Sequence, residues 1–370
     1  MHQMIQSIVD VLIIIMASIL AIFTVTLILL HLITLSNNKR MERIKQRILR
    51  MLSAAQDIEY LRGRIHDMLR PDSEIHSLRE TRGIQSGHGT IALSMVVKEA
   101  GPEQKDRLRE IILKDGWYLQ QMSHNLQSHN DDRVGTFTKL IAELHLPGFE
   151  DTVYDNLHRW KESAEIQEIS LLALFMCGEK DKLISLFSDP EFRLILSFRQ
   201  VLELFSYYSG DHAELYRELL GLECDGYIIR SCIRGIGTEG LAELCPLAMP
   251  YLDSDNINLI IDSIRTLGSL RYEPALVRIR EHTRHEVWSV RSAAVTALAA
   301  ISPDTCYPDL LRCLCDKAWW VRFHAAEALN TLPGHPELMD EVSALGDRYA
   351  FEMMRYIRER SEIFEKEAVA

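Results

Sequence analysis

The sequence predicts an all-α fold, a right-handed α-solenoid of about six helical hairpins preceded by one transmembrane helix. The first observation is a repeat: Val290–Leu298 and Val321–Leu329 share the pattern Val-Arg-x-x-Ala-x-x-Ala-Leu, 31 residues apart. A period of this length is typical of stacked helical hairpins. The second is an uncharged apolar run over residues 11–30. No segment shows the apolar–polar alternation of a strand over a useful length.

Three earlier segments repeat the same helix at spacings of 30 or 31 residues and begin at Phe198, Ile229 and Ile260. A fainter copy covers residues 170–175. The fifth and eighth positions of these segments and of the two clearest copies are apolar, namely Leu202, Ile233, Ile264, Ala294 and Ala325, then Phe205, Ile236, Leu267, Ala297 and Ala328. These positions share one helical face with the first, so we expect each helix to bury this face.

Each of the later repeats also has a preceding helix, expected over Glu239–Leu252, Pro274–His285 and Asp304–Lys317. The repeating unit is therefore a pair of antiparallel helices whose neighbours stack into one core. We expect the solenoid to cover residues 101–346. A charged helix over residues 347–370 is expected to cap it, because terminal repeats need a polar outer face.

The pattern Val-Arg-x-x-Ala-x-x-Ala-Leu, with an acid a few residues ahead (Glu286, Asp316), resembles the HEAT repeat. It is most similar to the short bacterial variety found in phycobilin lyases. The resemblance is strong over residues 223–332 and fades towards residue 165. It implies an internal ladder in which each arginine reaches an acid, involving Arg230, Arg291 and Arg322 with Asp225, Asp255 and Asp316. Ile261 replaces the arginine in one repeat, which breaks the ladder there.

The apolar run is long enough to cross about 30 Å of hydrocarbon as a helix, so residues 1–36 are predicted to be a transmembrane anchor. A cleaved signal peptide is disfavoured, since residues 1–10 contain no Lys or Arg and no small-residue cleavage site follows. Six basic residues lie between Lys39 and Arg50. The positive-inside rule then predicts a single-pass protein of the cell membrane, with its N-terminus outside and the rest in the cytoplasm.

Residues 37–70 are predicted to form a basic juxtamembrane amphipathic helix, because apolar residues recur from Met41 to Leu69 at steps of three and four. An isolated helix of this length is marginal in water, so the apolar face should pack on something. Self-association, a partner's membrane domain and the chain's own repeats are all open at this point. Residues 71–100 are predicted to be a linker, since Pro, Gly and Ser are frequent up to Thr90.

The composition narrows the functional class. The net charge is −12 although the segment from Lys39 to Arg50 is basic, so the rest of the chain is strongly acidic and nucleic-acid binding is not expected. The seven cysteines form no disulfide-like pattern, which suits a reducing compartment. His285-Glu286 and Cys313-x-Cys315 are too few or wrongly spaced for a metal site. No catalytic motif occurs, so we expect neither an enzyme nor a bound cofactor.

A candidate protein-binding surface lies at the start of the later repeat helices. Trp319 and Trp320 are adjacent, so they cannot share a helical face, and one of them should be exposed. Exposed tryptophan beside basic residues is a common anchor of protein interfaces. The predicted protein-binding residues are Trp288, Trp319, Trp320, Phe323, His324 and Arg284, with Arg271 and His285 expected nearby.

These features predict a membrane-anchored cytoplasmic scaffold or accessory subunit that binds a membrane-associated partner protein. Anchored HEAT-like proteins resemble accessory subunits of membrane assemblies, which implies a glycosyltransferase or polysaccharide synthase as the partner. The alternative is a lyase-like HEAT enzyme or small-ligand carrier tethered to the lipid bilayer. A signalling receptor is less favoured, since the segment expected outside is short.

Overall fold

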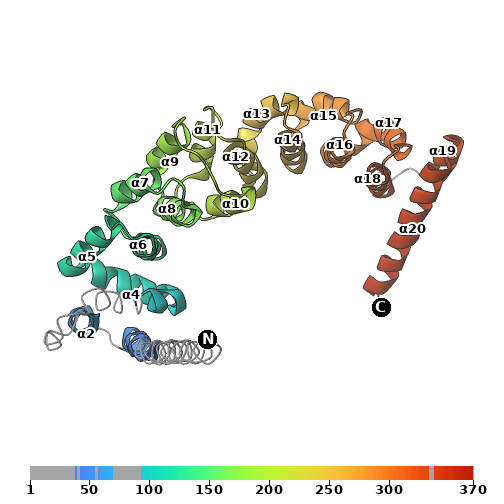
Figure 1. Cartoon of the computed structure of the whole chain (residues 1–370). Helices are drawn as coiled ribbons and strands as arrows, with labels where there is room; N and C mark the ends of the chain where they lie inside the picture. Colours follow the sequence, from blue (N-terminus) through green and yellow to red (C-terminus); the bar gives the residue numbers. More distant parts are fainter. Residues whose placement is uncertain (1–37, 40–41, 55–56, 70–92, 333–336, 370) are drawn as a thin grey trace, which may run out of the picture. The chain divides into compact units, whose positions relative to one another are not determined.

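The computed structural model describes residues 38–39, 42–54, 57–69, 93–332 and 337–369 of the chain. These residues form helices and turns, and no strand occurs among them. The prediction of an all-α fold is thus confirmed for the described part. The chain divides into two compact units, Met1–Trp160 and Lys161–Ala370, and each is considered by itself (Figure 1).

The predicted membrane anchor, residues 1–36, lies outside the described residues, as does most of the predicted linker. Within the described part of the chain, no helix combines the length and the apolar character needed to cross a bilayer.

In the first unit, the segment predicted to be a juxtamembrane helix packs on the chain's own helices. Residues 42–54 are helical, and α2 (Ile58–Leu69) follows. The buried side chains of these two stretches are Ile48, Leu52, Leu61 and Ile65, together with Lys45. Against α4 (Pro102–Leu113), the Arg107 guanidinium donates to the Leu52 carbonyl at 2.8 Å. Of the three occupants left open for this face, the structure therefore favours the chain itself.

Lys45 of this segment forms ion pairs within the first unit. Its side chain is only 5% exposed and pairs with Glu42 at 2.8 Å and Glu99 at 2.6 Å. Glu99 belongs to a helical stretch, residues 93–99, which buries Leu93, Val96 and Val97. The range predicted as a linker thus contains a helix near its end. The remaining helices are α5 (Gly116–Leu126), α6 (Asp131–Leu144) and α7 (Glu150–Arg159).

The second unit stacks helical hairpins in chain order. Its helices are α8 (Ala164–Cys177), α9 (Lys180–Phe187), α10 (Phe198–Ser206), α11 (His212–Leu219), α12 (Gly226–Glu239), α13 (Cys245–Ala248), α14 (Ile257–Ser269), α15 (Leu276–His282), α16 (Trp288–Ile301), α17 (Pro303–Leu314), α18 (Trp319–Asn330), α19 (Leu338–Ala344) and α20 (Arg348–Val369). Short 3-10 turns, Ala242–Leu244 and Met249–Asp253, flank α13, and a third, Glu273–Ala275, precedes α15. Helices α12, α14, α16 and α18 form one row and α11, α13, α15 and α17 the other (Figure 1). This arrangement is a helical solenoid, and its handedness stays a prediction.

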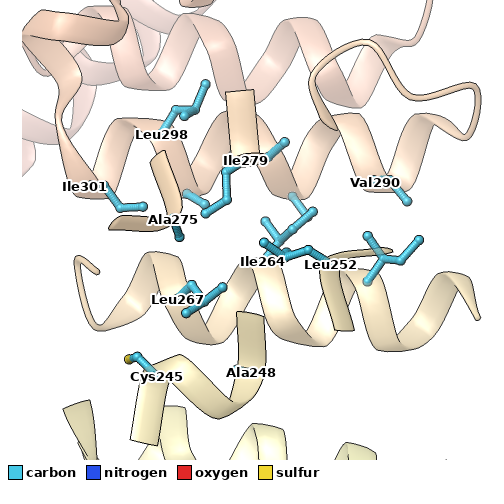
Figure 2. Close-up of a cluster of buried hydrophobic side chains, with 14 of the residues drawn as sticks. Cys245, Ala248, Leu252, Ile264, Leu267, Ala275, Ile279, Val290, Leu298 and Ile301 are labelled. Atoms are coloured by element: carbon cyan, nitrogen blue, oxygen red, sulfur yellow. The ribbon is translucent and has the colours of Figure 1, made fainter. Parts of the chain in front are cut away.

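The repeated apolar face forms the core of this unit. In α12, α14, α16 and α18 the first, fifth and eighth positions of the repeat are buried, as the period predicts. Figure 2 shows Ile264 and Leu267 of α14 beside Val290 and Leu298 of α16, with the two helices running in the same direction. A full burial of such a side chain contributes about 1.5–3 kcal/mol.

Helix α10 departs from the predicted face. Leu202 is only half-buried, whereas Phe205 at the eighth position is buried as predicted, together with Val201 and Leu204. The first residue, Phe198, does not enter the core, because its ring lies 3.8 Å from the Arg230 guanidinium and 5.7 Å from the Tyr227 ring. Helix α10 therefore differs from the later repeats at the first and fifth positions and agrees with them at the eighth.

The C-terminal helix is the second arm of a hairpin with α19. Its buried residues, Ala350, Met353, Met354 and Ile357, pack on α18 and continue the core. Beside this buried face, Tyr349, Tyr356 and Ile363 are all at least half exposed. The segment predicted as a cap therefore also continues the repeat pattern.

Candidate protein-docking surface

The predicted tryptophans begin the two most regular repeat helices. Trp288 is the first residue of α16 and Trp319 the first residue of α18, so they occupy equivalent positions. Their exposed fractions are 48% and 45%, and that of Trp320 is 50%. The expectation that one of the adjacent pair is exposed was too cautious, since both are. In the first turn of α18, neither side chain is covered by the preceding turn of the same helix.

Four aromatic rings of α18 form a continuous block, which we call the aromatic block: Trp319, Trp320, Phe323 and His324. Trp319 stacks on Phe323, one turn later, with ring centroids 5.0 Å apart. Trp320 stands at a right angle to Trp319 at 4.8 Å and stacks on His324 at 6.1 Å. Edge-to-face and offset pairs are the favoured aromatic geometries, so the block is an ordered surface.

Helix α20 holds the far side of this block. The Arg360 guanidinium lies 5.2 Å from the Phe323 ring centroid and donates to Glu327 at 2.7 Å. His324 Nδ1 also lies 3.4 Å from the Glu327 carboxylate. Phe323, His324 and Glu327 are all half-buried. These contacts therefore fix the inner rings, while the two tryptophans remain at the surface.

The other residues predicted for this surface differ in their placement. Arg284 is exposed in the turn before α16, on the side where Trp288 begins that helix. His285 serves the fold, since its Nδ1 accepts the Val287 amide at 3.0 Å. Arg271 follows the end of α14. Because α14 and α16 run in the same direction (Figure 2), Arg271 lies at the opposite end from Trp288, and its expected proximity is wrong.

The arginine ladder is partly as the resemblance implied. Arg291 donates from Nε and Nη2 to the Asp316 carboxylate at 2.7 and 2.8 Å, so one arginine of the expected set pairs with one acid of that set. Arg230 does not reach Asp225 or Asp255 but Asp262, at 2.8 Å on the next repeat helix. Asp225 instead caps α12, accepting from the Tyr227 amide.

The remaining arginine of the ladder, Arg322, forms no ion pair with any of the three expected acids, Asp225, Asp255 and Asp316, all of which lie among the described residues. Its Nη1 donates to the backbone carbonyls of Asp316 and Lys317, at 2.7 and 3.2 Å. The Asp316 carboxylate is already engaged by Arg291 and by the Ala318 amide.

Each partner of the Asp316–Arg291 pair shifts the pKa of the other towards its charged form. Burial raises the pKa of Asp316, but the hydrogen bonds from Arg291 and the Ala318 amide outweigh it and bring the pKa below its usual value. The same hydrogen bond raises the pKa of Arg291. Both groups therefore stay charged at neutral pH, and they tie α16 to the turn before α18.

The cysteines are structural in character. Cys232, Cys245, Cys306 and Cys313 are buried, and burial raises the pKa of Cys313 to about 11. A thiol with such a pKa is protonated at neutral pH and is a poor metal ligand. Among the described residues, no group of three or more His, Cys, Asp and Glu side chains could hold a metal ion.

A separate hollow of about 740 Å³ lies at the connection between α9 and α10. Phe187, Phe192 and Ile228 line it together with acidic residues that include Glu223. Gln167 holds the connection, donating to the Arg193 carbonyl and accepting the Ile195 amide, each at 2.9 Å. The hollow was not predicted from the sequence, because no motif marks an irregular connection.

Two residues of α20 that face α18 were also missed. Tyr349 is 66% exposed, and its ring centroid lies 5.5 Å from the Arg322 guanidinium. Arg360 holds Phe323 as described above. The period of about 31 residues could have found Tyr349, because Asp347, two residues earlier, follows Asp316 by one period.

Residues 278–350 match the family model of HEAT repeats. The match runs from α15 to the first residues of α20 and contains all of the predicted docking residues. This part of the chain therefore consists of HEAT repeats, which generally mediate interactions between proteins. No curated protein matches the chain.

Proposed function

We propose that this protein is a membrane-anchored HEAT-repeat scaffold, rather than an enzyme, which holds a partner protein at the cytoplasmic face of the cell membrane. Its anchor is the apolar run at residues 11–30, and its docking surface is the end of the solenoid around α16 and α18. The partner class we favour is a membrane enzyme such as a glycosyltransferase or polysaccharide synthase, on the resemblance alone.

The observation that supports docking is the aromatic block, with Trp319 and Trp320 about half exposed on a rigid helix. Large exposed aromatic groups on a monomer usually mark an interaction site. Tryptophan and arginine dominate binding energy at such sites because they bury much area with few rotatable bonds. The stacked rings are already ordered, which lowers the entropy that binding would cost.

The observation that supports an anchor lies in the sequence. Residues 11–30 carry no charge, and six basic residues follow between Lys39 and Arg50. This combination favours a spanning helix with its C-terminal side in the cytoplasm. Lys45 pairs within the first unit, which leaves the other basic residues to act as the orientation signal.

A second candidate, a lyase-like enzyme or a carrier of a small ligand, draws on the hollow at the α9–α10 connection. Its volume, about 740 Å³, is in the range of small-molecule sites. A bound pigment, nucleotide or other small molecule in the purified full-length chain would favour this candidate over the scaffold.

Docking is tested by purifying the full-length chain from membranes in mild detergent, as wild type and as a Trp319→Ala/Trp320→Ala variant. The expected result is a stoichiometric membrane protein that accompanies the wild type and is lost from the variant. Tyr207→Ala is the matched control, because Tyr207 is an aromatic residue of the same unit with 46% exposure. A partner retained equally by all three forms, or no stoichiometric partner at all, would contradict the proposed docking surface.

The anchor is tested separately by alkaline extraction of membranes and by protease accessibility in sealed vesicles. The wild-type chain should resist extraction, and Ile19→Arg/Leu20→Arg should release it, because charges at the centre of a span oppose insertion. The HEAT repeats should be cleaved only when the cytoplasmic face is exposed. Release of the wild type by alkali would contradict the anchor and leave the docking result unaffected.

A further inference from the structure

Arg322 and Arg291 occupy the same position of consecutive repeats and make the same first contact. Arg291 Nη1 donates to the carbonyls of His285 and Glu286, both at 2.8 Å. Arg322 Nη1 donates to the two carbonyls at the corresponding positions, those of Asp316 and Lys317. In each case the arginine holds the turn that precedes its own helix. The two side chains are therefore placed alike, and their remaining nitrogens can be compared.

The two arginines differ in the contacts of the other edge of the guanidinium, which carries Nε and Nη2. In Arg291, Nε and Nη2 form a two-point contact with the Asp316 carboxylate at 2.7 and 2.8 Å. In Arg322, Nε is buried and has no hydrogen-bond partner among the described residues. No ion pair of Arg322 with an acid is found in the described part of the chain either. The repeat thus reproduces the arginine without reproducing its acid.

The reason lies in Asp347, which follows Asp316 by one period. Asp316 Oδ1 caps α18 through the Ala318 amide and still accepts from Arg291. Asp347 caps α20 through the amides of Tyr349 and Ala350, at 2.8 and 3.0 Å, but does not reach Arg322. The ring of Tyr349 lies beside the Arg322 guanidinium instead. Because this ring is 66% exposed, it lies at the surface with few contacts to hold it.

A buried guanidinium nitrogen without an acceptor costs free energy, and a carboxylate is the group whose two oxygens fit the Nε–Nη2 edge. Trp319 lies one helical turn before Arg322, so the two side chains leave neighbouring positions on the surface of α18. An acid bound there would be flanked by apolar surface. This combination of one cation and several rings is selective for an acidic side chain beside an apolar one.

We infer that this surface binds an acidic segment of a partner protein. One Asp or Glu carboxylate of the partner accepts from the Nε–Nη2 edge of Arg322 after the Tyr349 ring turns aside. A neighbouring apolar side chain of the partner packs on Trp319 and Trp320. The inference rests on the proposed docking function, to which it adds the chemistry of the partner's segment.

The test uses the full-length chain in mild detergent and a display library of random 12-residue peptides. Peptides are selected on the wild type alone, and the affinity of each selected peptide for the wild type and for Arg322→Gln is then measured. The expected peptides are rich in Asp and Glu next to apolar residues. When the acid of a selected peptide is changed to its amide, affinity for the wild type should fall about tenfold, the value of one charge-assisted hydrogen-bonded contact. The same change should alter affinity for Arg322→Gln by less than about twofold.

Two variants guard against a fold defect in Arg322→Gln. Tyr349→Glu leaves Arg322 intact but supplies a carboxylate beside it, so it should block the acidic peptides and raise the melting temperature. Arg358→Gln removes an exposed arginine from α20, the helix that carries Tyr349, and should leave peptide affinity unchanged.

The outcomes distinguish recognition of an acid by Arg322 from docking at Trp319 and Trp320. Peptides that require Trp319 and Trp320 but show no preference for acids, or that bind Arg322→Gln equally, would overturn the inference and leave docking intact. Acidic peptides that still bind Tyr349→Glu would also overturn the inference. A library that yields no peptide distinguishing the wild type from Trp319→Ala/Trp320→Ala would overturn both.

Discussion

The α16–α18 and α18–α20 junctions are built from the same repeat, yet among the described residues only the first contains an arginine–aspartate ion pair. At the first, Arg291 reaches the Asp316 carboxylate and both side chains are nearly buried, 6% and 13% exposed. At the second, Arg322 keeps the turn contacts, but the Asp347 carboxylate is used to cap α20. The comparison teaches that consecutive repeats can place the same arginine alike and yet differ in whether a carboxylate meets it. Sequence similarity between the two copies does not reveal this difference.

The largest expected effect is a difference in stability between Arg291→Gln and Arg322→Gln. Arg291→Gln leaves the Asp316 carboxylate partly buried without its cation, which should lower the free energy of unfolding by about 3 kcal/mol. Arg322→Gln loses only its bonds to two carbonyls and should cost about 1 kcal/mol. Urea melts of the full-length chain in detergent, followed by tryptophan fluorescence, measure both. Equal losses would mean that the two junctions are closed by the same interactions.

The second effect concerns the close approach of repeat helices. A Cβ added to Gly268 of α14 would lie 2.6 Å from Ala297 Cβ of α16, so one helix must shift. Gly268→Ala should therefore destabilise the chain by about 2 kcal/mol, as overpacking of a core does. Gly226→Ala is the matched control, because a Cβ there meets nothing within 4 Å. Melts in which both substitutions cost the same would show that the helices do not need this contact distance.

The third effect is the pH dependence of the α16–α18 junction. The pKa of Asp316 is lower in the folded chain than its ordinary value of 3.8. Its contribution to stability is therefore complete above the unfolded value and is lost as the pH falls through the folded value. The stability difference between wild type and Asp316→Asn should be constant from pH 7 to about pH 5 and shrink below pH 4. Thermal melts across this range check it, and a difference that grows at low pH would contradict the assigned direction.

Periodicity was enough to predict the repeat helices of the second unit. The buried face of α12, α14, α16 and α18 follows from apolar residues at the first, fifth and eighth positions, because each helix packs on its neighbours in the same way. In α10 the prediction failed at Leu202, since the contact of Phe198 with Arg230 depends on the next repeat. The wrong ladder partner of Arg230 has a similar cause, as Asp262 lies on the following helix.

The candidate site was predictable only in part. Adjacent tryptophans on a helix predict exposure, and both Trp319 and Trp320 are exposed. The contacts of Tyr349 and Arg360 with α18 depend on how α20 packs, which the spacing of its own apolar residues does not fix. The position of Arg271 was misjudged because closeness in sequence to Trp288 is not closeness in space when consecutive repeat helices run in the same direction.

The smallest expected effect distinguishes Trp288 from the aromatic block. Trp288 is as exposed as Trp319, but no ring contact joins it to the block within the described part of the chain. Trp319→Ala removes a ring that also orders Phe323 and should weaken partner binding by about 30-fold, as at an interface hot spot. Trp288→Ala should weaken it by less than about fivefold, since an isolated peripheral ring contributes little. Titration of the purified partner against each variant measures both. A larger loss for Trp288→Ala would place the centre of the docking surface on α16 rather than on α18. The Nε–Nη2 edge of Arg322 would then lie at the edge of that surface.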